Sequence, residues 1–161
     1  MSTAVNGNPA SGVVRAIASG SEAFHRTLRR YLAIVATALG VGLESCMVDI
    51  DTPVSAYLAV DQKLAALPDR DVALLWDEEH GWSIAAETHC GEDLIVLAYL
   101  DTDTVVPPAD LVVRFVEELC AGNTELGRLD PPAIRTAGEP RGFFRQADLT
   151  GTADATLASV A

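Results

Sequence analysis

The sequence predicts an α+β domain in which five strands form a mainly antiparallel sheet. An N-terminal and a C-terminal helix are expected to pack on one face of that sheet. Three observations predict this fold: helical spacing of apolar residues near both ends, alternating apolar residues between them, and short turns between the alternating segments. With 161 residues, 49% of them hydrophobic and 21% charged, the chain has the length and composition of one globular domain.

The first helix is expected to begin at Ser19, because Ser19 and Glu22 have the spacing of a capping box. Gly40 stands where a C-terminal cap would lie. The apolar residues between them recur at helical spacing: Phe24, Leu28, Tyr31, Leu32, Val35 and Leu39. The opposite face carries a basic stripe: His25, Arg26, Arg29 and Arg30. Residues 1–18, which are small and polar, are expected to form a flexible leader.

Alternation of apolar and polar residues predicts the five strands. They are expected at 45–50, 54–60, 72–76, 82–87 and 94–100. The first two strands and the next two have turn sequences between them, which favours two hairpins. Segment 61–67 loses the alternation and is expected to form one or two helical turns before Pro68. The last strand is apolar throughout, so we expect it to be buried on both faces.

Pro107 and Pro108 open the second helix, and Gly122 is its expected cap. The domain is therefore expected at 19–122. Residues 123–161 contain several prolines and glycines and are expected to form an extended tail. Within it, Arg-Gly-Phe-Phe-Arg at 141–145 is either an anchor that docks on the domain or a short motif for a partner.

The sheet face away from the helices is expected to be partly exposed and apolar. Its predicted residues are Tyr57, Ala59, Ala73, Leu75 and Ala85. Such a face is typical of a dimer or partner surface.

The net charge is −12, and nearly all of it lies between Val41 and Thr104, where Lys63 and Arg70 are the only lysine and arginine. This charge argues against nucleic acid as a partner. No apolar stretch reaches the roughly 18–20 residues that cross a bilayer, and the N-terminus lacks the pattern of a signal peptide. The three cysteines have no disulfide or metal spacing, which favours a cytoplasmic protein.

Two segments, LWDEEHGW at 75–82 and ETHCGED at 87–93, resemble a small actinobacterial family of domains of unknown function. The resemblance covers roughly Phe24 to Gly122. It implies a bacterial protein in a cytoplasmic setting. It transfers no catalytic residue, because that family has no assigned activity.

The same two segments hold the densest polar side chains. The candidate ligand- or partner-binding residues are Trp76, Asp77, Glu78, Glu79, His80, Trp82, His89 and Cys90. In an antiparallel sheet the two loops lie at opposite ends of a strand, roughly 17–23 Å apart. Adjacent side chains such as those of His89 and Cys90 also diverge from a regular strand. The sequence therefore predicts no catalytic residue, no cofactor and no metal site.

Trp76 and Trp82 flank the polar turn. They are expected either to pair across the hairpin or to form the aromatic wall of a ligand site, with Glu78, Glu79 and His80 at its rim.

We interpret the chain as a non-enzymatic, acidic protein-interaction module, such as a regulatory adaptor, a chaperone-like protein or a neutralising partner. Its acidic edges would steer a basic protein partner, and we expect a homodimer. The alternative is a small-molecule sensor or small enzyme that uses the Trp76/Trp82 hairpin end or the His89–Cys90 loop.

Overall fold

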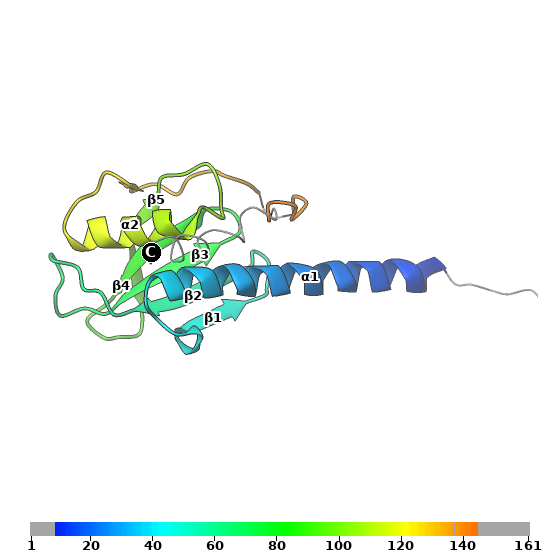
Figure 1. The fold of residues 1–161 in the computed structure, drawn as a ribbon, viewed down its shortest axis with the longest axis horizontal. Helices are drawn as coiled ribbons and strands as arrows, with labels where there is room; N and C mark the ends of the chain where they lie inside the picture. Colours follow the sequence, from blue (N-terminus) through cyan, green and yellow to red (C-terminus); the bar gives the residue numbers. More distant parts are fainter. Residues whose placement is uncertain (1–8, 137, 145–161) are drawn as a thin grey trace, which may run out of the picture.

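The computed structural model describes residues 9–136 and 138–144, with side chains from residue 20 onward (Figure 1). The elements in chain order are α1 (Pro9–Ala38), the 3-10 turn η1 (Leu43–Ser45), β1 (Cys46–Asp49), β2 (Ser55–Val60), β3 (Val72–Asp77), β4 (Gly81–Glu87), β5 (Leu94–Leu100), α2 (Ala109–Cys120) and β6 (Gly127–Arg128). Each strand pairs antiparallel with the next, in the order β1-β2-β3-β4-β5-β6. The prediction of an α+β fold with two helices and an antiparallel sheet is confirmed.

The sheet has six strands, not the five predicted. The sixth, β6, pairs with the end of β5 through Tyr99↔Arg128 and Leu100↔Gly127. It lies in the segment expected to be an extended tail. Two residues are too few to produce an alternating pattern, so the sequence held no signal for this strand.

Helix α1 begins at Pro9, ten residues before the predicted start at Ser19. Residues 9–18 are therefore helical rather than a flexible leader, whereas residues 1–8 lie outside the described residues. Proline is well accommodated in a first helical turn, where its missing N–H has no helical partner to lose. Thirty residues make a helix of about 45 Å, and Figure 1 shows its N-terminal half extending beyond the sheet.

Two further expectations about local structure were wrong. Segment 61–67 forms no helical turns; instead Leu64 and Leu67 make an isolated antiparallel bridge around a tight turn. The first half of β5 is exposed rather than buried on both faces, with Ile95 55% exposed. Apolar composition does not report which segments cover a strand, so it cannot decide burial by itself.

The core lies between the helices and one face of the sheet. Register places the fully buried Leu58, Leu74 and Ile84 side by side on β2, β3 and β4. They belong to one buried cluster with Tyr31 of α1 and Phe115 of α2. The alternate residues of the same strands point to the opposite face.

The C-terminal described residues pack on this core. The rings of Phe143 and Phe144 each lie with their centroids 5.8 Å from that of Phe24. Residues 141–145 were expected to be either an anchor on the domain or a short motif for a partner. The structure matches the anchor for residues 141–144, and Arg145 lies outside the described residues.

Candidate functional site

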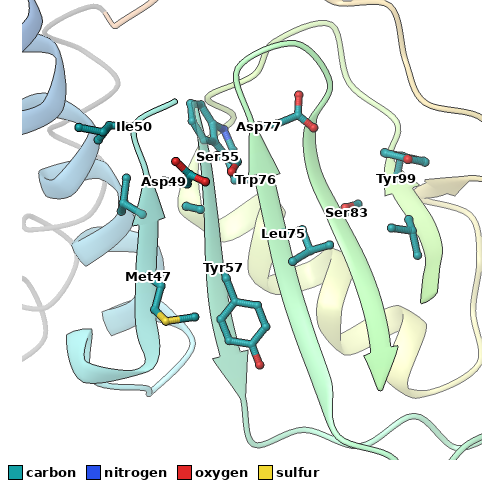
Figure 2. A pocket seen from close by; sticks show the side chains of 13 residues that line it. Met47, Asp49, Ile50, Ser55, Tyr57, Leu75, Trp76, Asp77, Ser83 and Tyr99 are labelled. Carbon is teal, nitrogen blue, oxygen red and sulfur yellow. The ribbon is translucent and has the colours of Figure 1, made fainter. Parts of the chain in front are cut away.

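The sheet face opposite the helices carries a row of five side chains, one from each of β1 to β5. Register aligns them across the sheet as Met47, Tyr57, Leu75, Ser83 and Tyr99. All five line a shallow hollow of about 600 Å³, and Figure 2 shows their side chains along it. We call this surface the open face.

A second row runs beside the first and carries the charge of the open face. Asp49, Ser55 and Asp77 are aligned by register on β1, β2 and β3, and all three line the hollow (Figure 2). No lysine, arginine or histidine is among the residues that line it. The open face is therefore an apolar surface that carries two carboxylates, with no lysine, arginine or histidine in the lining of its hollow.

Exposed apolar side chains concentrate at the two edges of the open face. Met47 and Ile50 at the β1 edge are 65% and 60% exposed, and Val96 on β5 is 38% exposed. Between them, Ser83 is only 5% exposed, because larger neighbours stand on both sides of it. The surface is thus concave, with exposed apolar side chains at its margins.

Register confirms that the five residues predicted for this face share it, since Tyr57 pairs with Leu75, and Ala73 pairs with both Ala59 and Ala85. Ala73 and Ala85 are, however, 1% and 0% exposed. Their short side chains lie below those of their neighbours, so the exposed surface is formed by the larger residues.

Backbone hydrogen bonds hold both carboxylates of the open face. Asp49 Oδ1 accepts from the Asp51 N–H at 2.9 Å. Asp77 Oδ1 accepts from the N–H groups of Glu79 and His80, both at 2.8 Å. Burial, followed by the charges of nearby acids, raises the pKa of Tyr57, so its hydroxyl is protonated at neutral pH and available as a donor.

Glu78, the next residue in this turn, is fully buried and is not a surface acid. Its carboxylate accepts four hydrogen bonds. They come from the Val54 N–H (2.9 Å), Arg135 Nη1 (3.0 Å), Arg141 Nε (2.8 Å) and Arg141 Nη2 (2.9 Å). Burial alone would raise the pKa of Glu78, but these donors lower it to about 2. Glu78 therefore ties the C-terminal anchor to the β3–β4 turn and is unavailable to a partner.

The remaining polar residues of this turn lie together at the surface. Asp77, Glu79 and His80 bring one potential metal-ligand atom each within 4.8 Å of one another. His80 Nδ1 lies 3.1 Å from Asp77 Oδ1, and the same oxygen accepts the two backbone N–H groups. The hydrogen bonding of a tight turn accounts for this arrangement.

Trp76 and Trp82 face each other directly across β3 and β4. They are 1% and 0% exposed, and Trp76 borders the open-face hollow only at its margin (Figure 2). Trp76 Nε1 donates to the Val105 carbonyl at 2.6 Å, and Trp82 Nε1 donates to the Tyr31 hydroxyl at 2.9 Å. Of the two alternatives, the geometry therefore matches a cross-strand pair rather than a ligand wall.

His89 and Cys90 lie at the other end of β4, which is about 23 Å long. Both are exposed in a turn closed by the Thr88 N–H, which donates to the Asp93 carbonyl at 2.9 Å. Within the described part of the chain, neither belongs to a group of three metal-ligand side chains. The structure thus brings Asp77, Glu79 and His80 together and separates them from His89 and Cys90.

Most residues of the open face were not predicted from the sequence: Met47, Asp49, Ile50, Ser83, Val96 and Tyr99. Extending the alternation of Tyr57 and Leu75 along β1 and β4 would have found Met47, Asp49 and Ser83. It would have failed on β5, because a bulge interrupts the pairing between Ile84 and Ala85. The bulge places Val96 and Tyr99 on the same face although they are three residues apart.

Within the described residues, no helix is long and apolar enough to cross a membrane. A search of curated proteins and a search of solved structures each gave no match. Residues 31–118, more than half of the chain, match a family described as a family of unknown function (DUF6292). The matched region contains all of β1 to β5 and therefore the whole open face, whereas β6 and the C-terminal anchor follow it. The chain thus belongs to this family of unknown function, DUF6292.

Proposed function

We propose that this protein is a non-enzymatic interaction module whose open face binds a protein segment carrying both apolar and basic side chains. The observation that carries the proposal is the composition of that face. Exposed apolar side chains surround two carboxylates, and no lysine or arginine lines the hollow.

The apolar part of the face would supply affinity. Met47 and Ile50 lie mostly in water at the edge of the sheet, and Tyr57 and Tyr99 offer large rings with a polar end. Methionine and aromatic residues are enriched where proteins bind one another. Burying such side chains releases about 25 cal/mol for each Å² of apolar surface removed from water.

The carboxylates would supply selectivity. Asp49 and Asp77 stand in one row on the face, and the surrounding residues 41–104 carry nearly all of the net charge of −12. Such a field attracts basic segments and slows the approach of acidic ones. The homodimer expected from the sequence stays a prediction. Contact between two open faces is disfavoured, because each would bring its carboxylates against those of the other copy.

The proposal that the protein is not an enzyme is supported by the distance between its reactive side chains, Cys90 and His80. Cys90 is exposed, and its described side-chain contact is with the Thr88 hydroxyl at 3.9 Å. His80 is bonded to Asp77 at the opposite end of β4. A thiol nucleophile needs a base within hydrogen-bond reach.

The proposal is tested with two ten-residue peptides that alternate valine or leucine with a charged residue, lysine in one and glutamate in the other. We expect the full-length protein to bind the lysine peptide, and to bind it more weakly as salt is raised. Fluorescence anisotropy of labelled peptides measures both affinities. Equal binding of the two peptides, or no binding of the lysine peptide, would overturn the proposal.

Variants locate the binding surface in the same assay. Asp49→Asn and Met47→Ser should each weaken the lysine peptide several-fold, because they remove one carboxylate and one apolar contact from the open face. Asp69→Asn is the matched control, since Asp69 is exposed and does not line the hollow. If Asp69→Asn weakened the lysine peptide as much as Asp49→Asn does, the affinity would depend on the net charge of the protein rather than on the open face.

A further inference from the structure

Strand β1 is an edge of the sheet and forms one margin of the open face. It pairs with β2 on one side, and among the described residues no strand lies on its other side. Such an edge presents backbone N–H and C=O groups to which a further strand can bind. We propose that the partner segment joins the sheet beside β1 as an added strand, with its basic side chains toward the open face and its apolar side chains toward α1. This inference rests on the proposed function and specifies how the segment binds.

Hydrogen bonding across the sheet shows which backbone groups of β1 face the free edge. The Glu78 N–H donates to the Val54 carbonyl at 3.0 Å, and this bond places Ser55 in a non-hydrogen-bonded pair with β3. The backbone groups of Ser55 therefore point toward β1, where its partner is Asp49. Because the direction alternates along a strand, Asp49 points its N–H and C=O groups toward β2, whereas Val48 points its own into the free edge.

The two sides of this edge differ in chemistry. On the open-face side stand Met47, which is 65% exposed, and the carboxylate of Asp49 (Figure 2). On the helix side, a hollow of about 180 Å³ between α1 and β1 is lined by Arg29, Leu32, Leu43, Cys46 and Val48. This hollow is smaller than the roughly 300–1,000 Å³ of typical small-molecule sites, so it suits single side chains.

An added strand would place its successive side chains on these two sides in turn. A lysine or arginine on the open-face side would lie beside the Asp49 carboxylate. An aliphatic side chain on the helix side would enter the hollow against Leu32 and Leu43, the second of which is 56% exposed. Arg29 is exposed at the same hollow and disfavours a second cation there. A segment that alternates basic and apolar residues therefore matches both sides of the edge.

The opposite edge of the sheet is less suited to such a segment. Strand β6 has two residues, and one of them is Arg128, whose side chain is 43% exposed. A basic segment would meet this cation and could form few backbone bonds. Strand β1 has four residues, contains neither proline nor lysine, and pairs with β2 without a bulge. It thus lacks three features that commonly prevent strand addition.

N-methylation of the lysine peptide tests the strand geometry with the full-length protein. Every second N–H of an added strand faces β1, and the others face solvent. Of two peptides methylated on alternate amides, one set each, we expect one to lose roughly tenfold or more in affinity and the other to bind like the unmethylated peptide. Fluorescence anisotropy measures both. Equal affinities of the two methylated peptides would overturn strand addition, and binding of the unmethylated peptide would then still support the proposed function.

Val48→Pro tests the edge itself. It removes the N–H that faces the free edge but no hydrogen bond to β2, and proline is tolerated at such positions of an edge strand. We expect roughly tenfold or greater loss of lysine-peptide affinity with an unchanged circular dichroism spectrum. Val48→Ile keeps the N–H and an apolar side chain, so it is the matched control and should bind as wild type does. Undiminished binding by folded Val48→Pro would overturn the proposal.

Hydrogen exchange of the wild-type protein, followed by NMR, gives a readout that needs no variant. Binding of the lysine peptide should slow exchange of the Val48 amide about tenfold or more, because this N–H becomes hydrogen-bonded. The Met47 amide, which points toward β2, is the internal reference. Unchanged exchange at Val48 with the peptide bound would overturn the proposal. A Val48 amide already protected in a dimer without peptide would also overturn it, because a second copy would then occupy the edge.

Discussion

At the scale of single residues, the β3–β4 turn shows how neighbouring acids acquire different roles. Asp77 lines the open face, whereas Glu78 is fully buried and bound by two arginines from residues 135–141. The two residues look equivalent in the sequence. Their roles diverge because successive positions at the end of a strand point in different directions.

Glu78→Gln is expected to destabilise the fold by about 3 kcal/mol at pH 7, because it leaves two buried or half-buried guanidinium groups without a charged partner. The pKa of Glu78 is lowered from 4.5 to about 2. Its stabilising contribution is therefore complete above about pH 4.5 and is lost as the pH falls toward 2. Urea unfolding at pH 7 and at pH 3 measures both effects.

The difference in stability between wild type and Glu78→Gln should accordingly shrink at pH 3. Glu22→Gln, at an exposed position of α1, serves as the control and should change the unfolding free energy by less than about 0.5 kcal/mol. A difference between wild type and Glu78→Gln that is the same at both pH values would contradict the role of the ionised carboxylate.

Tyr31→Phe is expected to destabilise the protein by about 1–3 kcal/mol. The Tyr31 hydroxyl donates to the Pro107 carbonyl at 2.7 Å and accepts from Trp82 Nε1. Removing it leaves a buried N–H and a buried carbonyl without this partner. Thermal unfolding followed by tryptophan fluorescence measures the change. Tyr57→Phe, on the open face, should be nearly neutral, and an equal loss in both variants would refute this account.

At the scale of elements, hairpins and close strand contacts depend on a few glycines. Gly81 opens β4 with φ +74°, and a Cβ there would lie 3.3 Å from the Cα of Val105. Gly91, in the loop between β4 and β5, has φ +68° with no atom within 4 Å of such a Cβ. The two positions share a left-handed backbone but differ in the space around them.

Gly91→Ala should therefore cost about 1–2 kcal/mol from backbone conformation alone. Gly81→Ala should cost more, because the same strain is combined with a close approach to the backbone of residue 105. Denaturant unfolding of the two variants compares these costs directly. If Gly81→Ala were no more destabilised than Gly91→Ala, the packing of β4 against the segment before α2 would be looser than the structure indicates.

At the scale of the whole molecule, the sheet separates two surfaces of different character. The open face has exposed apolar side chains and two carboxylates, and no lysine, arginine or histidine lines its hollow, whereas the face toward α1 and α2 forms the hydrophobic core. Arg135 and Arg141 are bound to Glu78 and so do not neutralise Asp49 or Asp77.

The sequence by itself determined the type and position of those helices and strands in which apolar residues recur at a regular spacing. Apolar residues at helical spacing from Phe24 to Leu39 predicted the buried side of α1, and all six are buried. Alternation predicted β1 to β5 and placed Tyr57 and Leu75 on the open face. These patterns are local, because each element must bury one side against whatever core forms.

Only the tertiary structure decided what depends on contacts between distant segments. Glu78 accepts a hydrogen bond from Arg141, which lies 63 residues further along the chain. Nothing in the sequence around either residue predicts that the two side chains pair. The β5 bulge moved Tyr99 to the open face and Ala98 to the core against simple alternation. Pairing partners and bulges arise from packing of the whole sheet, so the open face is a property of the folded chain rather than of any single segment.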